Sequence, residues 1–442
     1  MNISRRSALV SALLGSGTGY VGLRALATGL PASFLLNPRR ALAQASATAA
    51  GCAAADRAQF IIFNTSGAGD PINASVPGTY DDPLIAHSLD PAMAPTPLTL
   101  SGQATTAAAP WATLPQAALD RTCFWHLMTN TPVHPKEPEV LKLMGATYAG
   151  EMLPSLLAKN LAGCLGTIQS QPISVGATSP AEGLSYGGAA LPIVPALALK
   201  ATLTNPAGPL TNLQPLRDQT LTALYDLYKT HASPTQRDYI DSLVTSQRQV
   251  RNINQSLLNG LAAIKDNSPA SQILAAVTLI QMSVTPVVAI HIPFGGDNHR
   301  DVGLATETAQ TVSGVATVVA LLQQLAAAGL SDRVTLMSLN VFGRTIGPGN
   351  TDGRQHNPNH QVSITIGKPF RGGVMGGVAP VQNDYGAVGM DSTTGKGSPS
   401  GDIKAIDTLA SFGRTVLGAV GTDAVAIDAA ITGGKIVTGA LA

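Results

Sequence analysis

Polar residues that can bind a cation follow two apolar runs of the sequence. Asp70 lies in a glycine-rich turn at 64–73, and Asp297 and His299 lie two residues apart in the segment GGDNHRD. A carboxylate and an imidazole at that spacing on one loop can bind the same cation. The alternative for Asp70 is an ordinary turn residue, because aspartate is common at turns.

Two further groups combine hydroxyls, histidines and arginines. In the first, Thr131 lies between His126 and His134, so a nucleophile and a ligand occur close together. The alternative is a polar turn at the end of a strand. The second group spans 342–360 and includes His356. Its arginines, Arg344 and Arg354, can each hold an anionic oxygen by paired hydrogen bonds. The alternative there is a solvated glycine-rich loop.

The elements that position these groups alternate between strands and helices. Short apolar runs predict strands at 59–64, 122–128, 284–292, 333–337 and 362–366. Helical patterns cover 136–157, 213–229, 233–265, 268–282, 306–328 and 402–417, and the Pro-, Ala- and Thr-rich stretch 80–118 predicts a long surface loop. The alternation predicts an α/β fold with a doubly wound, mainly parallel sheet flanked by helices. We expect one domain at 57–442 with a helical insertion at about 205–282.

Composition excludes several classes of protein. Of the 442 residues, 45% are hydrophobic and 12% charged, so the chain is too apolar to be disordered. The net charge is +1, but residues 1–55 hold five arginines and no acid; the rest has 22 basic and 26 acidic residues, a charge of −4. That balance argues against a nucleic-acid partner. We also expect no transmembrane span in the mature chain.

The N-terminus resembles an export signal. Ser4-Arg5-Arg6 precedes a weakly apolar stretch that ends at the small-residue sequence Ala41-Leu42-Ala43. Paired arginines after serine indicate the twin-arginine translocase as a transient partner and a periplasmic or secreted location. We therefore expect a signal peptide at 1–43 and a flexible leader at 44–56. Outside the cytoplasm, the three cysteines allow one disulfide and one free thiol.

At the same residues the sequence resembles a bacterial domain-of-unknown-function family of twin-arginine-exported proteins, related to the alkaline phosphatase and sulfatase superfamily. Gly69–Asn73 with Val76-Pro77 is similar to the family's first-strand loop, in which G-A-D-G-L-N precedes V-V-P. Gly296–His299 is similar to its G-x-D-x-H segment. Phe342–Thr345 and Gly353–His356 are similar to its S-E-F-G-R-T and G-R-D-H signatures. The three signatures keep one order over most of residues 57–420.

The resemblance implies an alkaline-phosphatase-like fold and metal-dependent displacement at a phosphate or sulfate ester. Its residues map onto a metal site of Asp70, Asp297, His299 and His356, for zinc, calcium or manganese. Arg344 or Arg354 would stabilise the transferred group, and Thr131 or Thr129 is the candidate nucleophile. The chain departs from the family at two carboxylate positions, where it has Val341 and Gln355.

Three functions remain open from the sequence. The first is a metal-dependent hydrolase of phosphoric or sulfuric esters. The second is a catalytically degenerate relative that acts as a periplasmic binding or envelope-assembly protein, which the missing carboxylates favour because they would neutralise divalent cations. The third is an unrelated periplasmic enzyme. No phosphate-binding loop, dinucleotide motif or nucleophile elbow occurs at a fitting place.

Overall fold

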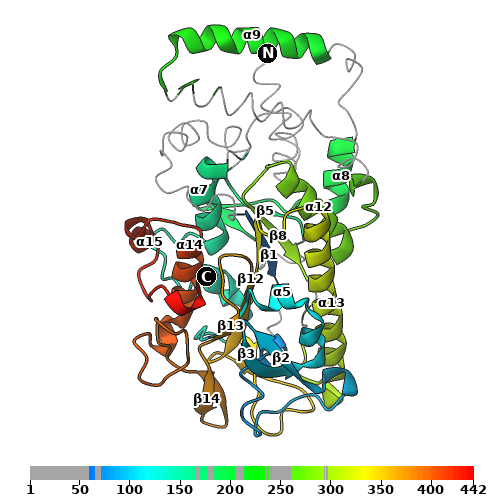
Figure 1. Ribbon diagram of the computed structural model, residues 1–442, viewed down its shortest axis with the longest axis vertical. Coiled ribbons are helices and arrows are strands. Elements are labelled where there is room, and N and C mark those ends of the chain that lie inside the picture. Colours follow the sequence, from blue (N-terminus) through cyan, green and yellow to red (C-terminus); the bar gives the residue numbers. More distant parts are fainter. Residues whose placement is uncertain are drawn as a thin grey trace, which may run out of the picture.

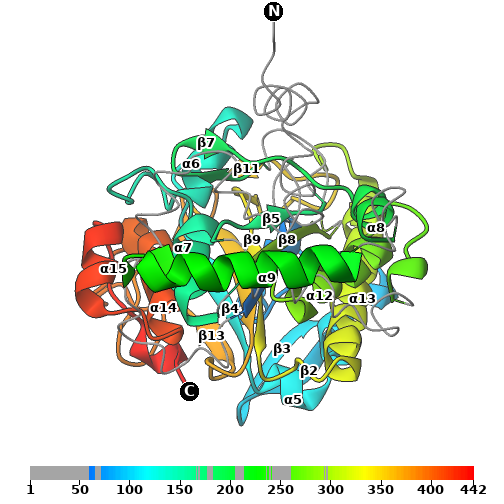
Figure 2. The same cartoon turned by 90° about the horizontal axis from the view of Figure 1, so that it is seen from above.

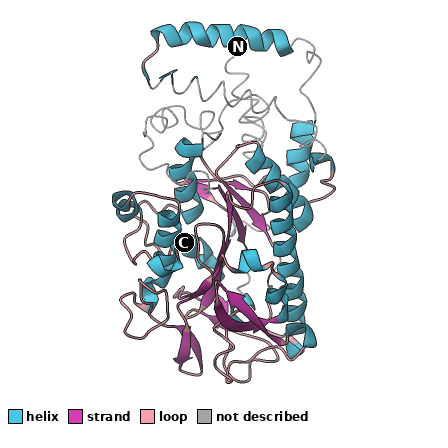
Figure 3. Cartoon of the chain, in the orientation of Figure 1, coloured by secondary structure: helices cyan, strands magenta, loops and turns pink. Residues whose placement is uncertain are grey.

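The computed structural model shows a central β-sheet with helices packed on both sides (Figures 1 and 3). It describes residues 59–64, 71–165, 167, 170–176, 183–204, 214–234, 236–237, 240, 260–292, 294 and 297–442. The predicted signal peptide and leader lie outside these residues, as does Asp70. The predicted α/β class, with a mainly parallel sheet flanked by helices, is confirmed.

The sheet has seven strands in the order β13-β4-β12-β9-β1-β8-β5. Neighbouring strands are parallel except at β12, which runs antiparallel to both β4 and β9. The strands are β1 Gln59–Asn64, β4 Thr122–Leu127, β5 Ile173–Ser174, β8 Val287–His291, β9 Val334–Leu339, β12 Gln361–Ile366 and β13 Gly373–Met375. The carboxyl ends of β1, β4, β8 and β9 therefore meet at one edge, together with the amino end of β12.

Alternating side chains of β1 divide the core into two halves. Ile61 and Phe63 pack into the cluster formed with α12 and α13, whereas Phe60 and Ile62 pack into the cluster formed with α7 and α14. A strand with apolar residues on both faces must be covered by helices on both sides, as here. The helices are α6 Glu137–Leu141, α7 Leu153–Leu165, α8 Ala196–Thr204, α9 Gln214–His231, α12 Pro269–Gln281, α13 Ala305–Ala327, α14 Thr408–Ala419 and α15 Ala424–Ala430.

Two predictions made from local pattern are wrong. The stretch 80–118 is not a surface loop, because it contains a hairpin of β2 Pro95–Leu100 and β3 Gln103–Ala108 with buried residues. The predicted helix 136–157 is broken into α6 and α7, because Leu143, Met144 and Gly145 all have positive φ angles.

The other short elements are α5 Gln116–Leu119, β6 Ser185–Tyr186, β7 Ala189–Ala190, β10 Gly343–Arg344, β11 His356–Asn357, β14 Val378–Val381 and β15 Asp384–Ala387.

The helices predicted at 213–229 and 268–282 are present as α9 and α12. α12 packs directly on β8 as part of the helical layer. α9 lies at one end of the molecule and crosses it in the view along the long axis (Figures 1 and 2). Most of the helix predicted at 233–265 falls outside the described residues.

The long helix α13 belongs to the core of the fold. Residues 302–327 have the length and composition of a membrane span, with a mean hydropathy of 1.2. The apolar face, which includes Val315, Val318, Leu321 and Leu325, is however buried in the same cluster as Ile61 and Phe63 of β1.

The described cysteines differ in state. Cys164 of α7 is disulfide-bonded, whereas Cys123 of β4 is a free thiol that is fully buried. Burial raises the pKa of Cys123 to about 12, so this thiol stays protonated and unreactive. The free thiol allowed by the cysteine count is therefore Cys123, and Cys52 lies outside the described residues.

Candidate functional site

The polar groups found in the sequence converge at the carboxyl edge of the parallel strands. Residues 128–134 follow β4, residues 297–301 follow β8, and Arg344 follows β9 within five residues. His356 and His360 come just before β12, whose amino end lies at the same edge. Open α/β sheets bind ligands at this edge.

The loop after β8 is fixed to the start of α13. Asp301 accepts hydrogen bonds from the backbone N–H groups of Thr306 at 2.8 Å and Glu307 at 2.9 Å, and so satisfies free donors at the beginning of the helix. Gly353 approaches the backbone of the same loop: a Cβ there would lie 2.3 Å from the His299 carbonyl oxygen. Only glycine fits between these segments, which places His299 next to the 353–356 loop.

Arg354 is a buried structural residue. Its Nε and Nη2 lie 2.6 and 3.1 Å from the two carboxylate oxygens of Glu307, and neither side chain is more than 1% exposed. The remaining guanidinium nitrogen and Nη2 also donate to the backbone carbonyls of Thr345 and Ala86. Arg354 is thus committed to the protein, so of the two predicted anion-binding arginines only Arg344 lies at the site.

Four of the predicted site residues lie together: Asp297, His299, Arg344 and His356. The Nε2 atoms of His299 and His356 are 3.0 Å apart, and Arg344 Nη1 lies 3.3 Å from His299 Nε2. Asp297 Oδ1 is 3.5 Å from His299 Nε2 and 3.8 Å from Arg344 Nη1. Asp297 is exposed, both imidazoles are half-buried and Arg344 is fully buried.

The hydrogen-bond partners fix the tautomer of one of the two imidazoles. The Pro132 carbonyl, 2.5 Å from His356 Nδ1, can only accept, so a neutral His356 has its lone pair on Nε2. His299 Nε2 faces both His356 Nε2 at 3.0 Å and Arg344 Nη1 at 3.3 Å; depending on its tautomer, it donates to the first or accepts from the second. In the tautomer that accepts from Arg344, two lone pairs face each other, and they repel unless a proton or a cation lies between them.

This arrangement is compatible with a bound metal ion. Two Zn–N bonds of about 2.0–2.1 Å at a tetrahedral angle would separate the nitrogens by about 3.4 Å, close to the observed spacing. A ligating histidine also usually donates its other N–H to a carbonyl or carboxylate, as His356 does. Within the described part of the chain, however, no group of three or more His, Cys, Asp or Glu side chains already forms a metal site. The described donors are therefore an incomplete set.

Charge and burial lower the pKa values of two of these groups. Burial is the main cause that lowers the pKa of His356, and the nearby Arg344 charge acts in the same direction. For Asp297, partial burial opposes ionisation, but the His299 backbone N–H and the charges of His299 and Arg344 lower its pKa overall. Ionised aspartate and neutral imidazole are the forms that bind metals.

The candidate nucleophile Thr131 is buried and lies directly before Pro132, whose carbonyl orients His356. The preceding residue, Asn130, has φ +53° and donates its backbone N–H to Pro358, which bends the chain toward the 356–360 segment. Thr129 instead donates its own hydroxyl to the Pro358 carbonyl at 3.4 Å. The Thr129 hydroxyl is thus bonded to the segment before β12, whereas Thr131 is linked to His356 through the backbone of Pro132.

At the two positions where the chain departs from the family pattern, the structure shows no carboxylate. Val341 is buried and apolar, and Gln355 is exposed. Asn340, the polar residue before Val341, donates its side-chain amide to the Val362 backbone carbonyl. Among the described residues, the carboxylate that faces the imidazoles of His299 and His356 is that of Asp297, beside the cation of Arg344.

One carboxylate at the site was missed in the sequence. Glu137, at the start of α6, is buried and lies 3.0 Å from Nδ1 of His134. The His134 ring centroid is 5.0 Å from that of His356 and 5.0 Å from that of Phe342. The three-residue spacing of His134 and Glu137 was the available signal, since such pairs meet on a helical turn.

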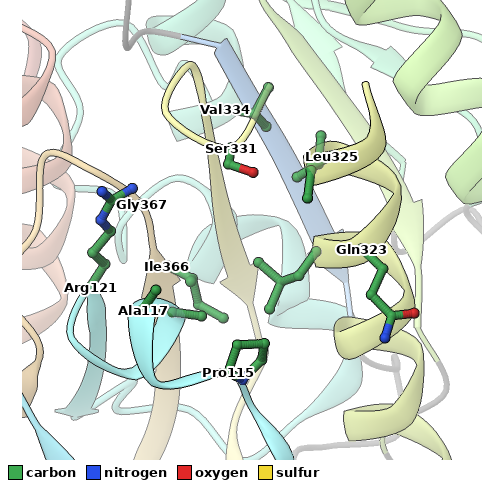
Figure 4. A pocket seen from close by; sticks show the side chains of 12 residues that line it. Pro115, Ala117, Arg121, Gln323, Leu325, Ser331, Val334, Ile366 and Gly367 are labelled. Atoms are coloured by element: carbon green, nitrogen blue, oxygen red, sulfur yellow. The ribbon is translucent and has the colours of Figure 1, made fainter. Parts of the chain in front are cut away.

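An apolar pocket lies at the opposite, amino edge of the sheet. Its volume is about 240 Å³, and it is lined by Leu325 of α13, Val334 at the start of β9 and Ile366 at the end of β12 (Figure 4). Its one charged lining residue, Arg121, is paired with Asp332 at 2.6 Å. Its lining offers one hydroxyl, that of Ser331, but no carboxylate, imidazole or thiol, so we do not take it as the candidate active site.

Comparison with known proteins identifies no relative: no family model, curated protein or solved structure matches the chain. The resemblance drawn from the sequence motifs therefore stays an expectation.

Proposed function

We propose that this chain is an exported, alkaline-phosphatase-like protein that hydrolyses phosphoric or sulfuric esters with the help of a divalent cation. The observation that carries the proposal is the meeting of Asp297, His299, His356 and Arg344 at the carboxyl edge of the sheet. It combines nitrogen and carboxylate donors with a buried guanidinium, which suits an anionic oxygen. The predicted twin-arginine signal at 1–43 supports a location in the periplasm or outside the cell.

Each residue has a distinct role in this proposal. Asp297, His299 and His356 would hold the cation, together with Asp70, which lies outside the described residues. The cation would polarise an ester oxygen and neutralise developing negative charge. Arg344 would donate to the equatorial oxygens of the transferred group and stabilise its developing charge. Because the Arg344 side chain is fully buried, a neighbouring side chain must move for the ester to reach it. Thr131 is the proposed nucleophile.

Hydrolysis of aryl phosphate and aryl sulfate esters by the purified mature chain tests the proposal. Replacing Arg344 by methionine is expected to lower kcat by about 10²–10³-fold, the usual cost of removing one charge-stabilising donor. Arg121→Met is the matched control, because Arg121 lies at the opposite edge of the sheet and should leave the rate unchanged. Equal rates for wild type and Arg344→Met would contradict the role given to Arg344, and no turnover by metal-loaded wild type would contradict a hydrolase.

A second candidate function is a non-catalytic periplasmic binding or assembly protein. Val341 and Gln355 favour it, because each stands where the resembling family has a carboxylate and neither supplies charge. Such a protein would keep the fold and lack stoichiometric metal. Metal content therefore separates the two candidates.

A further inference from the structure

A chain of hydrogen bonds runs through the core beneath the candidate site. His126 Nε2 lies 2.8 Å from the Pro77 carbonyl oxygen, and His126 Nδ1 lies 2.8 Å from His360 Nε2. His360 Nδ1 in turn lies 3.2 Å from Nδ2 of Asn73. All three side chains are fully buried, and the two imidazoles are stacked with ring centroids 5.1 Å apart. They connect strand β4 and the residue just before strand β12 to the short 3₁₀ helix Pro71–Ala74.

The chemistry of the end groups fixes the direction of every hydrogen bond in this chain. Because the Pro77 carbonyl only accepts, Nε2 of His126 carries a hydrogen, and Nδ1 of neutral His126 accepts. Nε2 of His360 then donates to it, which leaves Nδ1 of His360 to accept from the Asn73 amide. Burial lowers the pKa of His126 to about 4 and that of His360 well below its usual value, so both rings are neutral near neutral pH.

The chain of hydrogen bonds ends at Asn73, whose side chain is bonded to the backbone of Arg344. Its Nδ2 donates to the Arg344 carbonyl at 2.8 Å, and its Oδ1 accepts from the Arg344 N–H at 3.4 Å. The fit is tight: a Cβ on Gly343 would lie 1.9 Å from the His360 carbonyl oxygen and 2.9 Å from Asn73 Nδ2. Arg344 also pairs with His356 between β10 and β11. Asn73 therefore holds the segment that carries two of the site residues.

We propose that Asn73, His360 and His126 are positioning residues for Arg344. These three side chains form a hydrogen-bonded chain, called the relay below, that fixes the backbone of β10. The Arg344 guanidinium is thereby held close to Asp297 and His299. A buried relay with one permitted hydrogen-bond order holds its end group in a single place, as preorganised charge stabilisation requires. The inference rests on the proposed function only in assigning Arg344 to an anionic ligand.

Two variants of His360 test the relay. His360→Leu removes both the donor and the acceptor, whereas His360→Gln keeps one of each. Thr365→Val is the matched control: Thr365 accepts from Trp125 Nε1 at 3.1 Å, so the variant removes a buried hydrogen bond between the same two strands at the far end from His360. The measurements are the affinity for inorganic phosphate, the unfolding midpoint and the ¹⁵Nε–¹Hε resonance of Arg344.

We expect His360→Leu to weaken phosphate binding by about tenfold or more and to shift the Arg344 resonance, with recovery in His360→Gln. Thr365→Val should lower the unfolding midpoint and leave both the binding and the resonance unchanged. An Arg344 resonance that is unchanged in His360→Leu, or a loss of affinity as large in Thr365→Val, overturns the relay. Absence of phosphate binding in wild type contradicts the proposed function instead, and the resonance then still decides on the relay.

Discussion

Replacing Arg354 by methionine is expected to lower the free energy of unfolding by about 3–5 kcal/mol. The variant leaves the Glu307 carboxylate, which is 1% exposed, without the two guanidinium hydrogen bonds that hold it. Asn298 Nδ2, 3.0 Å from the same carboxylate, is a neutral donor and does not balance the charge. Denaturant unfolding of the purified chain measures the change.

Two control variants separate the effect of a buried unpaired charge from that of losing an arginine. Arg121→Met breaks an ion pair with Asp332, whose side chain is 59% exposed, and should change the free energy by less than about 1 kcal/mol. The double variant Arg354→Met/Glu307→Met is expected to be more stable than Arg354→Met alone, because no unpaired charge stays buried. If Arg354→Met lowers the free energy of unfolding no more than Arg121→Met does, the Arg354–Glu307 ion pair does not stabilise the fold as described above.

Acidification from about pH 6.5 to about pH 4 is expected to remove about 3 kcal/mol of stability through His126 alone. Burial lowers the folded-state pKa of His126 from 6.5 to about 4, so within this window the unfolded chain binds a proton that the folded chain does not. The contribution is therefore complete above about pH 6.5 and is lost progressively as the pH falls to about 4. His360, whose pKa is also lowered by burial, acts in the same direction.

Free energies of unfolding measured at about pH 7 and about pH 4.5 check this prediction, since the upper part of the window avoids most carboxylate titration. The control is His126→Asn, in which the residue cannot titrate and the pH dependence should be flatter, although its stability at neutral pH will be lower. The same difference between the two pH values in wild type and His126→Asn would contradict the assignment to His126.

The parts of the fold that depend on local pattern were predictable from the sequence. β1 has the predicted bounds, because a short apolar run between polar turns has few alternatives. α13 differs by one residue at each end, because it is a long run of good helix formers that Gly329 closes. The β2–β3 hairpin was missed because its strands, PTPLTL and QATTAA, carry few apolar residues and bury mainly their ends.

The sequence predicted which residues lie at the candidate site, but not which side chains hydrogen-bond or pair with one another there. Asp297, His299 and His356 lie together because they flank strand ends at one edge of the sheet, which topology alone suggests. The choice between Arg344 and Arg354 depended on Glu307, which lies 47 residues from Arg354 in sequence. Likewise, His126 and His360 were each noted within polar groups, but their hydrogen bond depends on the pairing of β4 with β12.

Metal content of the protein, purified without chelator, tests the central proposal most directly. The comparison is with the variant Asp297→Ala/His299→Ala, which removes one carboxylate and one of the two facing imidazoles. We expect near-stoichiometric zinc, calcium or manganese in the wild type and its loss in the variant. Equal metal content in the two proteins, or no metal in either, would contradict a metal-dependent hydrolase at this site, and the second result would favour a non-catalytic envelope protein.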